Sequence, residues 1–208
     1  MKKMTIKEFK DKSYIEVIED IMKMNNGYVT SKQISNFGIH RMYLNIMKKK
    51  GMIEKVGNGI YIDSNKIEDS YFVLSLELPN VIYSHMTALY FYGLSIKAPN
   101  EKYDVTVPNN YYNYKLKEHN AFYVSKNIYE LGLIEIETPM GNKVRAYDIE
   151  RCICDIIKSK NRMDLEHVKH SIKTYIKSKD KNIIKLSKYA NEMGIKDEVM
   201  DYIGYFYE

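Results

Sequence analysis

The sequence predicts an α+β protein: an N-terminal winged helix-turn-helix followed by a mixed α+β domain with a helical C-terminal end. Three observations predict this class. Residues 28–62 hold two short helical patterns joined at a glycine and then two apolar strands. Short apolar runs recur between residues 81 and 147, and helical periodicity continues from residue 149. We expect the first domain to span residues 1–66 and the second residues 67–208.

The first helix is expected near the N-terminus. Thr5 and Glu8 have the spacing of a capping box. Ile15, Ile18 and Ile21 then form an apolar stripe at helical spacing, which predicts that the helix continues almost to Gly27.

Two further helices are predicted around a sharp turn. Thr30 precedes the first of them, where its hydroxyl can cap a free amide, and Gln33 has the capping-box position. Gly38 supplies the positive φ that a tight turn needs. A helix from Ile39 to about Lys50 should follow, ended by Gly51.

This third helix should be amphipathic. The apolar face, which should pack on the first two helices, comprises Ile39, Tyr43, Leu44 and Met47. The polar face comprises His40, Arg41, Asn45, Lys48 and Lys49. Beyond Gly51, the Asn58-Gly59 pair between two apolar runs predicts a β-hairpin, the wing.

The distribution of charge favours a DNA-binding first domain. Residues 1–66 carry 13 Lys+Arg and 7 Asp+Glu, whereas the remainder carries 19 and 20. The net charges are therefore +6 and −1, which is typical of a DNA-binding module joined to a near-neutral domain. The competing interpretation is that lysines only coat a solvated helix.

Arg41 is the first candidate for reading base edges, because an arginine near the start of a recognition helix can bind guanine with two hydrogen bonds. Weaker candidates are His40 and Asn45 for base edges and Asn58 for the minor groove. Phosphate contacts are predicted for Lys48, Lys49 and Lys55, and for Thr30 and Ser31 through their amides and hydroxyls.

The second domain should begin with a helix over residues 71–78, stopped by Pro79. A short strand at 81–83 precedes a helix capped by Ser84. Further strands are expected at 103–107, 121–124, 133–137 and 143–147, and helices at 149–159, 164–178, 182–193 and 197–206. Six lysines between Lys169 and Lys185 recur at roughly helical intervals, and a solvated face is their simplest explanation.

Several short motifs, in order, resemble the AbiEi family of antitoxins from type IV abortive-infection toxin–antitoxin systems. In the first domain they are Gly38-Ile39-His40-Arg41, Leu44, Gly51 and Val56–Tyr61. In the second domain they are Tyr83–Leu89 with Gly93-Leu94, Val105–Pro108, and Tyr147–Arg151 with Asp155. The resemblance covers about residues 5–160. One departure is Ile46, which stands where a basic residue is expected.

The resemblance implies a function. Members of that family bind inverted repeats of double-stranded DNA in their own promoter through a winged helix-turn-helix and repress the operon. Their C-terminal domain carries the antitoxin activity. It acts against a nucleotidyltransferase-like toxin, AbiEii, without a stable complex between the two proteins.

The polar motif residues of the second domain have two interpretations. An enzyme would use the carboxylates as metal ligands and His85 as a base; alternatively these residues cap, pair and pack, as Arg151 and Asp155 at i,i+4 can. The set is Ser84, His85, Asp148, Glu150, Arg151 and Asp155. The chain has no Gly-rich phosphate loop, HExxH or Gly-x-Ser-x-Gly motif. We therefore expect a binding protein with no cofactor and no metal, and a generic regulator whose second domain binds a ligand or a partner is the alternative.

The remaining features bear on location. Cys152 and Cys154 are the only cysteines, and we expect both to be reduced thiols. The sequence has no apolar run of transmembrane length and no signal-peptide pattern. A cytoplasmic protein with no membrane partner is therefore expected.

Overall fold

The structure, a computed structural model, describes residues 12–206. It divides into two compact units, Met1–Pro79 (unit 1) and Asn80–Glu208 (unit 2). Together they contain helices and two β-sheets, so the expected α+β class is confirmed. The predicted Thr5–Glu8 capping box lies outside the described residues.

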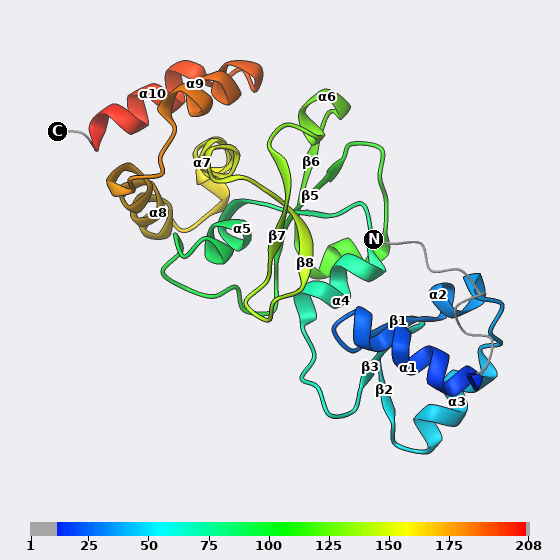
Figure 1. The fold of residues 1–208 in the computed structure, drawn as a ribbon. Helices are drawn as coiled ribbons and strands as arrows, with labels where there is room; N and C mark the ends of the chain where they lie inside the picture. The colour runs from blue at the N-terminus through cyan, green and yellow to red at the C-terminus, as the bar shows by residue number, and fades with distance from the viewer. Residues whose placement is uncertain (1–11, 207–208) are drawn as a thin grey trace. The chain divides into compact units, whose positions relative to one another are not determined.

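Unit 1 combines four helices with a three-stranded sheet in its described part (Figure 1). Its elements are α1 (Tyr14–Met24), β1 (Tyr28–Thr30), α2 (Ser31–Asn36), α3 (Met42–Lys49), β2 (Ile53–Gly57), β3 (Ile60–Asp63) and α4 (Ser70–Glu77). Helix α1 begins with a capping box between Ser13 and Glu16. The helix expected over residues 71–78 corresponds to α4.

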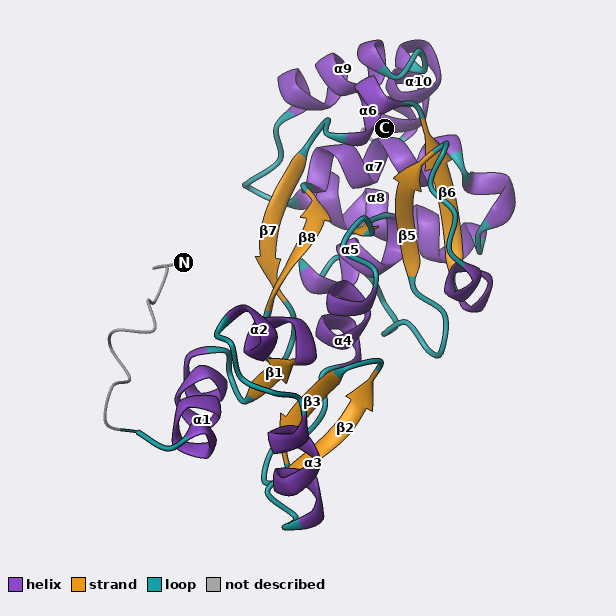
Figure 2. Cartoon of the chain, turned by 90° about the vertical axis from the view of Figure 1, so that its right-hand side faces the viewer, coloured by secondary structure: helices purple, strands orange, loops and turns teal. Residues whose placement is uncertain are grey.

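The small sheet has apolar side chains on both faces, and Figure 2 shows its strands between helices. Its strand order is β1-β3-β2, and all pairs are antiparallel. Along β3, Tyr61 belongs to the core formed with α1, α2 and α3. Ile60 and Ile62 instead pack with Val73 of α4. Because side chains alternate along a strand, the central strand β3 has buried side chains on both faces of the sheet.

Helix α4 therefore belongs to unit 1. The predicted boundary lay after residue 66, whereas the structural division follows Pro79. The difference changes the charge balance, because residues 67–79 contain Glu68, Asp69 and Glu77 and no Lys or Arg. With the division at Pro79, the net charges become +3 for unit 1 and +2 for unit 2. The charge asymmetry of the sequence thus depended on the position chosen for the boundary.

Unit 2 is built around a five-stranded mixed sheet with the order β6-β5-β4-β8-β7. The β4–β8 and β5–β6 pairs are parallel, and the β4–β5 and β7–β8 pairs are antiparallel. The elements up to β8 are β4 (Ile82–Tyr83), α5 (His85–Phe91), β5 (Asp104–Pro108), η2 (Tyr114–Glu118), β6 (Asn120–Val124), α6 (Lys126–Tyr129), β7 (Leu133–Glu137) and β8 (Lys143–Tyr147).

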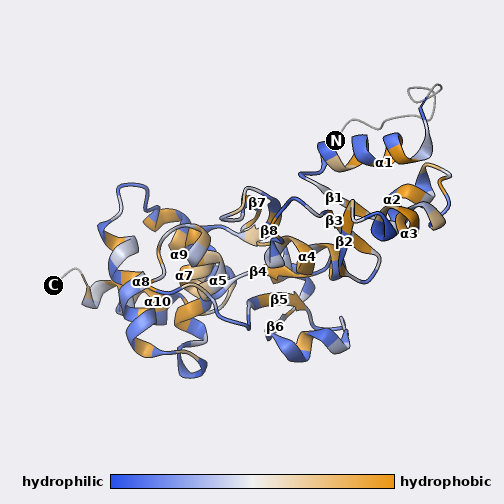
Figure 3. Ribbon diagram, turned by 90° about the horizontal axis from the view of Figure 1, so that it is seen from below, coloured by the Kyte–Doolittle hydropathy of each residue, from blue (hydrophilic) through white to orange (hydrophobic). Residues whose placement is uncertain are grey.

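The C-terminal end of unit 2 is helical, as expected. Its elements are α7 (Ile149–Lys158), η3 (Lys160–Arg162), α8 (Leu165–Lys177), α9 (Ile183–Glu192) and α10 (Lys196–Tyr205). Figure 3 shows hydrophilic and hydrophobic residues alternating along α8 and α10. Helix α7 differs, because residues 150–157 are all buried, including Cys152 and Cys154, whose thiols are free. It contacts both α5 and α9 and forms the centre of this unit.

Among residues 12–206, every helix is too short or too polar to cross a lipid bilayer.

Candidate nucleic-acid interface and a buried polar motif

Helix α3 begins later than predicted. Its first residue is Met42 rather than Ile39, and Ile39 is buried ahead of the helix at 3% exposure. The His40 Nδ1 atom accepts a hydrogen bond from the Met42 amide at 3.1 Å. His40 therefore caps the first turn, and Arg41 occupies the N-cap position. Helix N-termini are usually capped by Asn, Asp, Ser or Thr, so the sequence did not predict a histidine in this role.

The two faces of α3 otherwise follow the prediction. Leu44 and Met47 are each 1% exposed and lie in the core of unit 1, with Tyr43 partly buried against it. The polar face is exposed and comprises Arg41, Asn45, Lys48 and Lys49. Within residues 12–206 these four side chains form no hydrogen bond or ion pair, so their polar groups face solvent. Ile46 is half-buried beside them.

The N-terminus of α2 carries the predicted capping box. The Gln33 amide donates to Thr30 Oγ1 at 3.1 Å, and the Thr30 amide donates to Gln33 Oε1 at 2.7 Å. The Ser31 amide donates to the Gly59 carbonyl at 2.7 Å. The amides of Thr30 and Ser31 are thus already engaged within the protein, contrary to the expectation that they would hold a phosphate. Only the hydroxyls remain for that role.

Strands β2 and β3 form the predicted hairpin around residues 57–59, which we call the hairpin turn. Gly57 pairs with Ile60, and Gly59 has a φ of +69°, which glycine adopts without strain. Asn58 is exposed at the tip, and Lys55 is exposed on β2. The Asn58 amide donates to Glu77 Oε1 at 3.0 Å.

Unit 1 also has an open hollow of about 630 Å³ beside the C-terminal ends of α1 and α3. Its lining includes Glu19, Lys23, Asp63 and Lys66, and none of the predicted DNA-binding residues. The hollow is therefore separate from the polar face of α3.

In unit 2, Ser84 occupies the N-cap position of α5, but its side chain makes no capping hydrogen bond. A residue of β5 caps the helix instead: the Met86 backbone amide donates a hydrogen bond to Asp104 Oδ2 at 3.1 Å. Asp104 is also held by the Asn120 amide group at 2.9 Å and is buried at 7% exposure. Burial raises the pKa of the Asp104 carboxyl.

The Ser84 hydroxyl belongs instead to a chain of hydrogen bonds through His85. Thr106 Oγ1 donates to Ser84 Oγ at 2.9 Å, and Ser84 Oγ lies 2.8 Å from His85 Nδ1. His85 Nε2 lies 3.2 Å from Ser159 Oγ, and the tautomer of the ring decides which partner donates in its contacts with Ser84 and Ser159. Burial and then the charge of Arg151 lower the pKa of His85 well below 6.5, which favours the neutral ring.

His85 is also conformationally unusual. Its φ is +49°, it is 2% exposed, and its ring stacks on Phe122 with centroids 3.6 Å apart. A non-glycine residue in this region is strained and persists where its surroundings hold it. The base role of the enzyme interpretation would need solvent or substrate at this ring, which the packing closes off.

Asp148 and Glu150 fasten α7 to α9 through one lysine. Lys185 Nζ lies 2.9 Å from Asp148 Oδ2 and 3.1 Å from Glu150 Oε2. Asp148 Oδ1 caps α7 by accepting the Arg151 amide at 3.0 Å, and its Oδ2 accepts from the Tyr189 hydroxyl. The two hydrogen bonds that Asp148 accepts, together with the shared lysine, give these carboxylates a structural role.

Arg151 lies at the centre of unit 2 with 0% exposure. Its Nε donates to Asp155 Oδ1 at 3.1 Å, which confirms the predicted i,i+4 pair. Its Nη1 donates to the carbonyls of Ile128 and Leu131 at 2.6 and 2.8 Å. The guanidinium also lies over the Tyr147 ring, 4.1 Å from the centroid. Burial raises the pKa of the Asp155 carboxyl to about 6 despite this partner.

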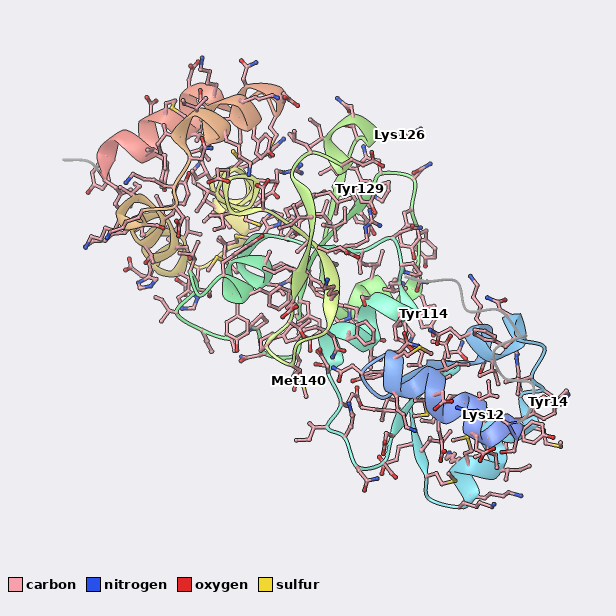
Figure 4. All side chains as sticks on the ribbon, in the orientation of Figure 1. Lys12, Tyr14, Tyr114, Lys126, Tyr129 and Met140 are labelled. Atoms are coloured by element: carbon pink, nitrogen blue, oxygen red, sulfur yellow. The ribbon has the colours of Figure 1, made fainter. Side chains whose placement is uncertain are left out.

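The carbonyls that receive Arg151 are positioned by α6. In Figure 4 its Tyr129 side chain points toward the sheet and Lys126 points outward. The Tyr129 hydroxyl donates to the Asn80 carbonyl at 2.6 Å, and the Tyr129 carbonyl accepts from the Tyr147 hydroxyl at 2.7 Å. These bonds fix the segment whose carbonyls Arg151 requires.

The sequence did not identify Asp104, Lys185 or Glu77 as important. Lys185 was counted with the solvated lysines, yet it holds two carboxylates. Asp104 begins β5, whose residues 104–107 are all buried, and an acid among buried strand positions would have marked it as paired. The contact of Glu77 with Asn58 crosses 19 residues and leaves no local signal.

The part of the chain between residues 12 and 206 contains no group of three or more His, Cys, Asp or Glu side chains arranged to hold a metal ion.

Comparison with known proteins leaves the family open. No protein-family model matches the chain, and no curated protein matches it. Among solved structures, the crystal structure of the RV2827C protein from Mycobacterium tuberculosis is similar to it with a TM-score of 0.49 and 9% sequence identity. That alignment covers 93% of this chain and 81% of the other.

Proposed function

We propose that this chain binds double-stranded DNA through unit 1, acting as a winged helix-turn-helix, and that it represses the promoter of its own toxin–antitoxin operon. The observation that carries the proposal is the polar face of α3. Asn45, Lys48 and Lys49 are exposed on α3, and Arg41 is exposed at its N-cap, while the opposite face of the helix is in the core. The β2–β3 hairpin of the same unit adds Lys55 and Asn58.

The physical roles of these residues differ. Arg41 stands just before the first turn of α3, so its guanidinium is free to reach a guanine edge, a contact worth about 1–3 kcal/mol of base discrimination. Lys48 and Lys49 occupy the last turn, where they supply charge for phosphates without reading sequence. His40 keeps Nε2 for a base edge, because its Nδ1 accepts the Met42 amide.

Fluorescence anisotropy with the promoter of this operon and a scrambled duplex of equal length tests DNA binding. We expect tighter binding to the promoter duplex. With about 4–6 phosphates contacted, log K should fall with log salt at a slope of about −4 to −5. Equal affinity for both duplexes, or no salt dependence, would refute a sequence-specific DNA-binding role.

The antitoxin half of the proposal rests on the resemblance to the AbiEi family. It predicts that co-expression of the full chain with a nucleotidyltransferase-like toxin from the adjacent gene restores growth, although the two proteins do not co-purify. A triple variant, Arg41→Ala with Lys48→Ala and Lys49→Ala, should lose promoter binding and still protect. If protection were lost with DNA binding, the chain would act only through repression.

The alternative is a regulator whose second domain binds a small ligand, and one observation favours it. Unit 2 has a hollow of about 190 Å³ whose lining residues include Thr87, Lys102, Asp104, Asn120 and His167. A metabolite that raised the melting temperature and shifted promoter affinity would support this alternative over the antitoxin.

A further inference from the structure

We propose that Glu77, the last residue of α4, is a positioning residue that holds the hairpin turn in the shape in which it meets DNA. The inference rests on the proposed function, because it concerns the same DNA-binding surface. It assigns α4 a part in recognition, although the α3 face and the hairpin alone motivated the proposal.

Glu77 holds the turn from one side. The Asn58 amide donates to Glu77 Oε1 at 3.0 Å. Gly57 lies against the same carboxylate, since a Cβ atom at this position would come within 2.8 Å of Oε1. Glycine at residue 57 therefore allows the close approach that the hydrogen bond to its neighbour needs.

Helix α2 holds the turn from another side. The Gly59 carbonyl accepts the Ser31 amide at 2.7 Å. A Cβ atom at Gly59 would lie 3.1 Å from Ser31 Oγ, so this approach is also close. The exposed tip residue Asn58 is thus held by its own backbone amide on Glu77, and the next residue, Gly59, is held by its carbonyl on Ser31.

The position of Glu77 is fixed by the packing of α4. Phe72, Val73 and Leu76 pack in the core that contains Ile60 and Ile62. The start of the helix is tied down as well, because the Asp69 amide donates to the Tyr28 hydroxyl at 2.7 Å. A carboxylate on a fixed helix loses less conformational freedom when it holds a turn than one on a loop would.

The charge of Glu77 works against the role of the surface around it. A carboxylate near a DNA-binding turn repels phosphates, so its removal has two opposed effects: less repulsion and a looser turn. Glutamine separates the two, because it keeps the Oε1 acceptor and removes the charge. Alanine removes both.

The first measurement is hydrogen exchange of the Asn58 backbone amide in the full-length protein, followed by NMR. Loss of one hydrogen bond should speed exchange about three- to tenfold in Glu77→Ala, with little change in Glu77→Gln. The second is promoter affinity, which should be about three- to tenfold weaker for Glu77→Ala than for Glu77→Gln, at an unchanged salt slope. An unchanged slope separates positioning from a lost phosphate contact.

Glu54→Ala is the matched control, because Glu54 is an exposed carboxylate on β2 of the same hairpin. It should bind DNA as tightly as wild type or tighter, with no change in Asn58 exchange. Equal promoter affinity of the Ala and Gln variants would overturn the inference, as would an Asn58 amide that exchanges equally fast in wild type and Glu77→Ala. If wild type bound no promoter DNA, the proposed function would fail, while a protected Asn58 amide would still identify the contact.

Discussion

The polar face of α3 and the polar residues of α7 have opposite surroundings. On α3, Arg41, Lys48 and Lys49 are exposed and without an intramolecular partner in the described chain. On α7, Arg151 and Asp155 are buried and joined to each other. Arg41 on one side, and Arg151 with Asp155 on the other, stand in motifs of the same sequence resemblance. The exposed set is available to another molecule, whereas the buried pair holds the protein together.

The difference bears on what a motif can establish. A motif formed by buried residues that bond to one another indicates how the helices are held together. It says little about which molecule the protein binds. The exposed residues of α3 are the ones whose chemistry can select a partner. Four variants can break or sharpen this contrast, beginning with the largest expected effect.

Arg151→Ala should be the most damaging. It leaves the Asp155 carboxylate buried without its cation and two carbonyls without their donor. We expect the free energy of unfolding to fall by about 3–5 kcal/mol in urea titrations. Lys169→Ala, an exposed change on α8, should stay within about 0.5 kcal/mol of wild type. Similar stabilities for the two variants would remove the distinction between buried and exposed polar residues.

Asp155 should make stability depend on pH. Its carboxyl pKa is about 6 in the folded protein against an ordinary value of 3.8. The folded state therefore binds a proton more tightly than the unfolded state, so this group's contribution to stability decreases as pH rises from about 4 to about 6. The full change is of order 3 kcal/mol.

His85 acts in the opposite direction, because its lowered pKa makes acid pH destabilising. The Asp155 effect is therefore measured as the difference between wild type and Asp155→Asn, across unfolding titrations from pH 4 to 7. A difference that is flat over this range would show that the carboxyl titrates normally.

Arg41→Ala should affect recognition and leave the fold intact. We expect the preference for promoter over scrambled DNA to fall by about 1–3 kcal/mol in anisotropy titrations. The melting temperature should not change, since the side chain is exposed. If Arg41→Ala kept the wild-type preference for promoter DNA, His40 or Asn45 would be the residue that reads the bases.

Lys49→Ala should have the smallest effect. Loss of one phosphate contact weakens binding to promoter and scrambled DNA alike and lowers the salt slope by about 0.9. Lys169→Ala in unit 2 is the comparison. If Lys49→Ala changed base preference while the slope stayed constant, Lys49 would contact a base edge.

Much of the fold could be predicted because its signals are local. The Thr30 cap, the Asn58-Gly59 turn and the apolar spacing on α3 each act within a few residues. The later start of α3 could not be predicted, because it depends on the His40 side chain, which accepts a hydrogen bond from the Met42 backbone amide. Predicted site residues in unit 2 were identified by type, but their roles depend on Lys185 and Asp104, which are distant in sequence.

The boundary differed for a related reason. The apolar pattern of α4 is compatible with packing on either unit. Only its tertiary contacts with Ile60, Ile62 and Tyr28 show that it belongs to unit 1. Sequence periodicity identifies a buried face but not the surface that covers it.

The burial of β3 on both faces has a practical consequence for anyone who expresses the N-terminal part alone. A fragment that ends at Lys66 would expose Tyr28, Ile60 and Ile62 to solvent, and this apolar patch would promote association with other molecules. Self-association of such a piece could then be mistaken for a native oligomer. A cut after Pro79 retains the helix that shields this patch and gives the safer reagent.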